Sequence, residues 1–103
     1  MDVNENLLYK EVPPIINGFR PDLYYEFNSI LIIGEAKTRN DYSTKHSLNQ
    51  YKEYLKYCEN FCGNSYLILC CPWECSADVK IIISKISRDN KTNIIILDEI
   101  SGD

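Results

Sequence analysis

Long apolar runs, glycine and proline are all scarce in this sequence of 103 residues. No apolar stretch approaches the roughly 18 residues that a membrane-spanning helix needs, and the first residues lack the basic start and long apolar stretch of a signal peptide. With four glycines and four prolines, the sequence shows no fibrous repeat and no flexible linker. We therefore expect an intracellular, cytoplasmic protein without a membrane partner, in which residues 1–103 form one domain.

Disulfide pairing is poorly supported, although the sequence contains five cysteines. An odd number with two adjacent members, Cys70 and Cys71, is a poor disulfide framework, and reduced thiols suit the expected compartment. The pairs Cys58/Cys62 and Cys71/Cys75 each enclose three residues, whereas the pairs of a zinc ribbon enclose two. Buried structural thiols are the favoured interpretation, and a metal site is the alternative.

The charge of the chain is unevenly distributed. The formal net charge is −4, which argues against a nonspecific nucleic-acid coat protein. Residues 37–56, however, hold five basic and two acidic residues, a local net charge of +3. The basic residues are Lys37, Arg39, Lys45, Lys52 and Lys56. A phosphate backbone could approach this face, and the alternative is a solvated helix surface.

Short apolar segments separated by turn residues indicate strands in the first half of the sequence. The extended segments are 14–16, 19–27 and 30–36. Asn17-Gly18 is a strong two-residue turn signal between the first two segments, and Asn28-Ser29 is a weaker one before the third. The three segments are predicted to form an antiparallel meander. Tyr25 and Phe27 fall on the face opposite Asp22 and are expected in the core.

The second half alternates helical and strand patterns. Apolar or aromatic residues recur at the spacing of an amphipathic helix over 45–58 and again over 76–87. Strands are predicted at 65–71, which Pro72 ends, and at 94–97. The alternating order implies right-handed parallel crossovers. The predicted fold class is therefore α/β, a mixed central sheet in which an antiparallel meander precedes parallel strands, with helices on its faces.

The Asn28-Ser29 turn predicts a register that brings two carboxylates together. If it is a two-residue loop, Asp22 lies directly opposite Glu35. Directly opposed side chains have Cβ atoms about 4.5–5.5 Å apart, and like charges there are destabilising. Because side chains alternate along a strand, Lys37 lies on the same face as the two acids.

Two carboxylates and an ammonium group at this spacing suit divalent-metal chemistry. Mg²⁺ and Mn²⁺ prefer oxygen ligands, and either ion would neutralise the repulsion between Asp22 and Glu35. Lys37 beside the metal could orient or activate water and offset charge on a phosphate. The arrangement favours phosphoryl chemistry, and the alternative is a structural ion pair of Lys37 with the two acids.

The same residues resemble a known family motif. Arg20-Pro21-Asp22, twelve intervening residues and Glu35-Ala36-Lys37 are similar to the PD-(D/E)xK nuclease signature. The predicted helix supplies Gln50 and Tyr54, as in members that carry a Q-x3-Y element, and the motif segments look like those of small VRR-NUC-like members. The resemblance covers about residues 14–69 and implies a restriction-endonuclease-like fold.

The resemblance implies a nuclease that hydrolyses DNA phosphodiester bonds with Mg²⁺ or Mn²⁺. Asp22 and Glu35 would be metal ligands, and Lys37 would position or activate the attacking water. Gln50 would hold the backbone or contact a phosphate. The family usually adds an acidic residue from a first helix, for which Glu5 is the candidate metal ligand here.

Two rival interpretations of the motif remain open. The chain is then either a catalytically inactive module of the same fold, which binds nucleic acid or a protein partner, or a subunit of a larger restriction, recombination or transposition complex. The acidic net charge keeps these alternatives open.

Further contacts to DNA are predicted around the motif. Arg20 and Arg39 flank the motif strands, and Lys45 and His46 lie at the start of the predicted helix. One face with a local charge of +3 is small for gripping a duplex. We therefore expect a homodimer with two sites.

Overall fold

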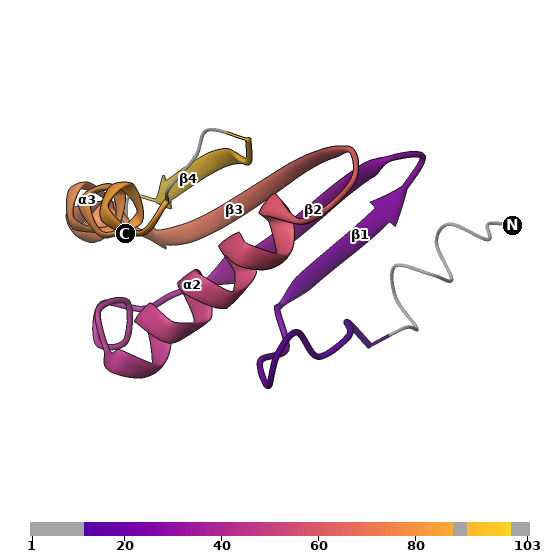
Figure 1. Ribbon diagram of the computed structural model, residues 1–103. Coiled ribbons are helices and arrows are strands. Elements are labelled where there is room, and N and C mark those ends of the chain that lie inside the picture. The colour runs from indigo at the N-terminus through magenta and orange to yellow at the C-terminus, as the bar shows by residue number, and fades with distance from the viewer. Residues whose placement is uncertain (1–11, 88–90, 100–103) are drawn as a thin grey trace, which may run out of the picture.

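Strands and helices alternate along most of the chain (Figure 1), in a computed structural model that describes residues 12–87 and 91–99. The strands are β1 (Leu23–Phe27), β2 (Ile30–Ala36), β3 (Asn64–Pro72) and β4 (Asn93–Glu99). The helices are α2 (Lys45–Glu59) and α3 (Ser76–Ile86), and a short 3-10 helix, η1 (Trp73–Cys75), leads directly into α3.

The four described strands form one mixed sheet in the order β1-β2-β3-β4. β1 runs antiparallel to β2, and β3 and β4 then continue the sheet in parallel. Asn28 and Ser29, with φ of 51° and 64°, both adopt the left-handed conformation that a two-residue hairpin turn needs, and Phe27 pairs with Ile30 across it. The predicted α/β class, with an antiparallel pair followed by parallel strands, is confirmed, and so is the hairpin register.

The predicted three-strand meander is wrong, because its first segment is not a strand. Ile16 and Phe19 form an isolated antiparallel bridge, with N–H···O distances of 2.6 and 3.0 Å, around the Asn17-Gly18 turn. The predicted Asn17-Gly18 turn is therefore confirmed. Pro21, two residues after Phe19, has no N–H to donate, so the pairing does not extend along the second segment, and β1 begins only at Leu23.

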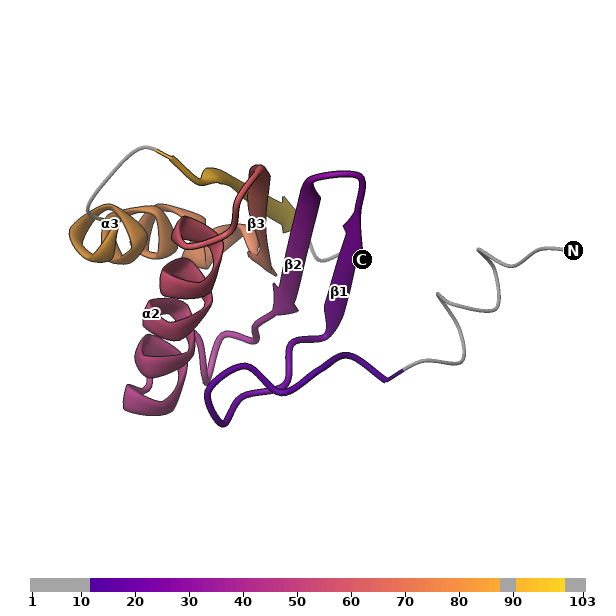
Figure 2. The same ribbon diagram turned by 45° about the vertical axis from the view of Figure 1, so that its right-hand side comes forward.

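Both described helices cover the same face of the sheet, which corrects the expectation of helices on its two faces (Figure 2). The chain moves across the sheet in one direction, from β2 to β3 and then to β4. Two right-handed crossovers that advance in the same direction put their helices on the same side. The hand of the connections therefore decides the layering, which becomes one layer of helices on one sheet.

The core lies between these two layers. Alternate residues of the strands point toward the helices, and the fully buried ones are Leu31, Ile33, Leu67 and Leu69. The buried stripe of α2 packs on them, and its members are Ser47, Gln50, Tyr51, Tyr54, Leu55 and Cys58. α2 begins at a cap in which the Thr44 hydroxyl accepts a hydrogen bond from the Ser47 N–H. The expectation of buried thiols is confirmed for Cys58, Cys71 and Cys75, whereas Cys62 is exposed.

The other face of the sheet has no helix over it among residues 12–87 and 91–99. The prediction that Tyr25 and Phe27 are core residues is therefore wrong, since 39% and 59% of their surfaces are exposed. Leu97 of β4 is 50% exposed on the same face. None of the helices in the described part of the chain is long and apolar enough to cross a membrane.

A glycine after α2 provides a test of the packing at the hairpin turn. A Cβ added at Gly63 would lie 2.4 Å from the Ser29 carbonyl oxygen, and the φ of 152° disfavours side chains as well. Gly18, with φ of 92°, has open space around it. We expect Gly63→Ala to lower the free energy of unfolding by about 2 kcal/mol or more and Gly18→Ala by about 1 kcal/mol. Urea denaturation measures both, and an equal or smaller loss at Gly63 would contradict the predicted contact.

Candidate active site

Asp22 and Glu35 oppose each other at the open end of the hairpin, as the register predicts. Leu23 pairs with Gly34 in the last regular rung, so the next pair is Asp22 with Glu35. The Asp22 N–H donates to Glu35 Oε1 at 3.3 Å, and the Ala36 N–H donates to Asp22 Oδ2 at 2.8 Å. The ladder between β1 and β2 is thus continued by carboxylates, and backbone N–H groups hold both acids in place.

Lys37 is buried directly beside this pair. It is 8% exposed, and its Nζ lies 3.8 Å from Glu35 Oε2 and donates a hydrogen bond to Gln50 Oε1. The Lys37 N–H donates to the Cys70 carbonyl of β3 at 2.8 Å, which fixes the backbone at the end of β2. Nζ also lies 5.7 Å from the centre of the Tyr51 ring, within the range of a cation–π contact.

Helix α2 supplies the other polar groups of the site. Gln50 and Tyr54 are four residues apart and therefore lie one above the other on the helix face that meets β2. The Tyr54 hydroxyl donates to Glu35 Oε1 at 3.3 Å, and Gln50 accepts from Lys37. Asp22, Glu35, Lys37 and Gln50 were all predicted to meet, and the structure brings them together.

Burial is the main electrostatic influence on Glu35. It raises the pKa of this carboxyl, and the facing charge of Asp22 raises it further, while Lys37, the Asp22 N–H and Tyr54 lower it. The pKa of Tyr54 is raised by burial and by the neighbouring Glu35, so its hydroxyl remains a neutral donor. The site therefore contains a carboxylate whose ionised form is partly compensated rather than fully paired.

The two acids differ in their access to solvent. The side chain of Glu35 is 9% exposed and that of Lys37 is 5% exposed, whereas Asp22 is an exposed residue. Within residues 12–87 and 91–99, no three His, Cys, Asp or Glu side chains gather into a metal-binding group. Glu5, the predicted third acid, lies outside the described residues. The described donors for a cation are thus the two opposed carboxylates, approached from the side of Asp22.

Two of the predicted DNA contacts lie beside the site. The exposed His46 packs edge-on against Phe19, with ring centres 5.3 Å apart, and Phe19 in turn contacts Tyr54 at 6.5 Å. Arg20 is exposed, and its guanidinium donates to the Pro13 carbonyl at 2.5 Å. The turn before β1 therefore packs against α2 beside Tyr54.

The other two predicted contacts point elsewhere. Arg39 pairs with Glu74 of η1 at 2.6 Å, which ties the loop after β2 to the region before α3. Lys45 is exposed at the first position of α2, and Lys52 and Lys56 follow on the solvent side of the same helix. Much of the basic segment is thus a solvated helix surface turned away from the carboxylates.

Sequence reasoning missed the tyrosine pair that extends the site along β1. The Tyr24 hydroxyl donates to Glu26 Oε1 at 2.7 Å and lies 3.0 Å from the hydroxyl of Tyr57 on α2. The signal was present, because Tyr24 alternates with Asp22 along the strand and Tyr57 follows Tyr54 by one helical turn. The pair joins β1, an edge strand of the sheet that the described residues form, to α2.

No protein-family model, curated protein or solved structure matched this chain.

The raised pKa of Glu35 predicts a specific pH dependence of stability. Between the unfolded and folded pKa values the folded state binds more protons, so this group makes the protein less stable as pH rises through that interval. We expect the free energy of unfolding of Glu35→Gln, minus that of wild type, to be larger at pH 7 than at pH 4. Glu74→Gln, on an exposed ion pair, serves as the control. Denaturation at both pH values tests this, and a stability difference between wild type and Glu35→Gln that is independent of pH would contradict it.

Proposed function

We propose that the chain is a minimal PD-(D/E)xK-type nuclease domain with a restriction-endonuclease-like fold, which hydrolyses DNA phosphodiester bonds with Mg²⁺ or Mn²⁺. One observation carries this proposal. Two carboxylates oppose each other at the open end of the β1–β2 hairpin, beside a buried lysine whose ammonium lies between Glu35 and Gln50. A chain selected for stability alone has no reason to keep like charges at directly opposed positions.

The donor set fits a small divalent cation. Mg²⁺ is typically bound in proteins by one or two carboxylates and keeps several waters or takes substrate phosphates as its other ligands. Asp22 and Glu35 provide two carboxylates, and the exposed position of Asp22 leaves room for a phosphate or water on that side. When bound, such an ion would polarise a phosphoryl oxygen and acidify a bound water.

The residues of the chain itself supply positioning. Lys37 keeps its ammonium in a low-dielectric setting beside Glu35, where a fixed positive charge stabilises a developing negative charge more strongly than it would in water. Gln50 accepts a hydrogen bond from this ammonium, which lies 3.8 Å from Glu35 Oε2. Tyr54 and the Asp22 N–H both bind Glu35 Oε1, which leaves Oε2 facing Lys37. The lysine and the acids are therefore oriented before a substrate arrives.

Binding of DNA without cleavage is the second candidate function. Two observations favour it. Among the residues that the structure describes, no third acid joins Asp22 and Glu35 in a metal-binding group, and the side chain of Glu35 has low exposure. The two candidates differ in one measurable property. A nuclease turns over DNA only with a divalent cation, whereas a binding module retains DNA whether or not the cation is present.

Neutralising Lys37 tests the proposed chemistry. Because Lys37 is buried, Lys37→Met is preferable to Lys37→Ala, since it keeps most of the side-chain volume. We expect Lys37→Met to lower the rate of Mn²⁺-dependent DNA cleavage by a factor of about 100 or more. Cleavage of linear, branched and single-stranded DNA by the purified chain gives the measurement, and Lys52→Met on the exposed side of α2 is the control. Equal activity of wild type and Lys37→Met would remove the assignment.

Neutralising Asp22 separates a metal site from a structural ion pair. Asparagine still offers an oxygen to the Ala36 N–H but removes the charge that faces Glu35. We expect Asp22→Asn to be as stable as wild type without metal, or more stable by up to about 1 kcal/mol. It should also lose most of the stabilisation by metal, which for wild type is about 2.7 kcal/mol at one hundred times the dissociation constant.

Thermal melts of both proteins, with and without millimolar Mn²⁺, provide this comparison. Asp22→Ala is the matched variant, because it removes the charge and the hydrogen-bond acceptor together and should be less stable than Asp22→Asn. A wild type that does not respond to metal and is weakened by Asp22→Asn would identify an ion pair and rule out the metal site.

A further inference from the structure

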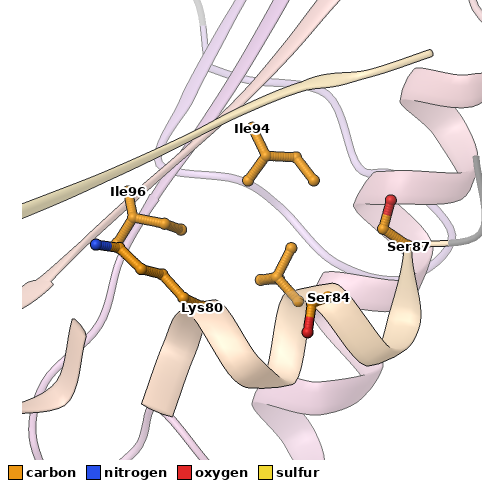
Figure 3. Close-up of a pocket in the computed structure, with 6 residues that line it drawn as sticks. Lys80, Ser84, Ser87, Ile94 and Ile96 are labelled. Carbon is orange, nitrogen blue, oxygen red and sulfur yellow. The ribbon is translucent and has the colours of Figure 1, made fainter. Parts of the chain in front are cut away.

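Two of the cavities in the described part of the chain differ in the chemistry of their walls. The one between α3 and β4, of about 460 Å³, has an apolar wall, and its charged group is the ammonium of Lys80 (Figure 3). The other lies at the closed end of the β1–β2 hairpin and has a volume of about 520 Å³. We call it the hairpin cavity, and it is lined by Glu26, Ser29, Tyr57, Asn60, Phe61 and Cys62.

The hairpin cavity has the charge of a cation site. Among the described residues that line it, Glu26 alone is charged, and there is no Lys or Arg. The hydroxyl of Ser29 and the amide of Asn60 can both accept hydrogen bonds. An anion would meet a carboxylate without a cation in the wall to offset it, whereas a cation would be paired. The cavity therefore suits a positively charged group.

Tyr24 holds two walls of this cavity in place. Its hydroxyl donates to Glu26 Oε1 at 2.7 Å and lies 3.0 Å from the Tyr57 hydroxyl, and the two tyrosine rings meet edge-on with centres 6.3 Å apart. Burial raises the pKa of Tyr24, so its hydroxyl remains a neutral donor. Glu26 Oε2 has no hydrogen-bond partner among residues 12–87 and 91–99. A carboxylate and an aromatic ring are thus positioned together, and one carboxylate oxygen is left for a ligand.

We propose that the hairpin cavity binds the guanidinium group of an arginine side chain from a partner protein. A guanidinium is planar and always charged, and its N–H fork matches a carboxylate while its face stacks on an aromatic ring. Glu26 supplies the carboxylate, and Tyr57, 39% exposed, supplies the ring. A lysine ammonium carries the same charge but is compact and strongly hydrated and has no plane to stack. The two walls together therefore select arginine over lysine.

The exposure of the walls favours a side chain of a larger partner over a free small molecule. Small-molecule sites bury about 70–90% or more of the surface of their ligands. The hairpin cavity is shallower than that, because all its lining residues except the half-buried Phe61 are exposed. An arginine in a partner chain is also held by contacts around the cavity, and arginine and tyrosine are both enriched where proteins meet.

The net charge of −4 further favours the approach of a basic partner. This binding does not depend on nuclease activity.

Peptides that differ at one residue test the recognition of arginine. The probe is a short acetylated peptide of glycine and serine with one central arginine, titrated into isotope-labelled wild type. We expect saturable NMR shifts at the backbone amides of Glu26, Tyr57 and Asn60. Peptides with a central lysine or citrulline should bind at least about fivefold more weakly, because lysine lacks the plane and citrulline lacks the charge. Equal binding of the arginine and citrulline peptides, or no saturable shift at these amides, overturns the proposal.

Variants of the two walls test the assignment of the cavity. Glu26→Gln keeps an oxygen that can accept from Tyr24 but removes the charge, and it should weaken binding of the arginine peptide about tenfold. Tyr57→Leu should weaken it about fivefold, whereas Tyr57→Phe keeps the ring and should retain most of the affinity. Glu74→Gln, an exposed acid outside the cavity, is the control. Unchanged affinity in both Glu26→Gln and Tyr57→Leu overturns the proposal.

A nucleotide is the competing occupant, because bases also stack on tyrosine. Guanosine monophosphate, titrated into the same labelled protein, is the probe for it. We expect no saturable shift at the amides of Glu26, Tyr57 and Asn60, since the phosphate would face a carboxylate. Tighter binding of this nucleotide than of the arginine peptide at these amides overturns the proposal.

Discussion

The repulsion between two carboxylates at the end of a hairpin is the constraint around which this domain is arranged. Asp22 and Glu35 stand opposite each other, and every polar group near them reduces the cost of that opposition. Backbone N–H groups bind each acid, and Tyr54 binds the buried one. Lys37 supplies the positive charge, and Gln50 accepts a hydrogen bond from its ammonium. Since these groups come from the hairpin and α2, and the Lys37 backbone is bound to β3, all three elements must be in place before the site has its geometry.

The hand of the crossovers is the second constraint, and it acts on the scale of the whole domain. Successive right-handed connections in one direction put α2 and α3 on the same face. That face gains a packed core and the site. The other face keeps apolar side chains such as Phe27 in contact with solvent, and β4 remains an edge. The same topological rule thus produces both the best-packed and the least-covered surfaces of the described chain.

Local signals in the sequence were enough to predict the site geometry. The Asn28-Ser29 turn determines the register, and the register determines that Asp22 meets Glu35. Helical spacing then puts Gln50 and Tyr54 on the same side of α2. These are short-range properties of the backbone, which neighbouring residues largely decide.

The features that sequence reasoning missed depend on distant parts of the chain. Tyr25 is apolar enough for a core, and only the placement of both helices shows that no helix of the described residues covers its face. Arg39 flanks the motif in sequence, yet Glu74, thirty-five residues away, pairs with its charge. Pro21 interrupts the ladder of the expected meander because pairing needs an N–H that proline lacks. Long-range partners and missing donors therefore account for the errors.

The two backbone N–H groups at the end of β2 bind partners on opposite sides of the strand, and this affects how the hairpin can open. The Ala36 N–H goes to the side chain of Asp22, whereas the next N–H, that of Lys37, goes to the backbone of β3. A breathing motion at the end of the hairpin would therefore separate Asp22 from Glu35 while Lys37 stays anchored to the parallel part of the sheet. Amide exchange at Ala36 would report this partial opening separately from global unfolding. Asp22, the acid nearer the solvent, is therefore the one that such fraying would displace, whereas the buried Glu35 stays beside Lys37.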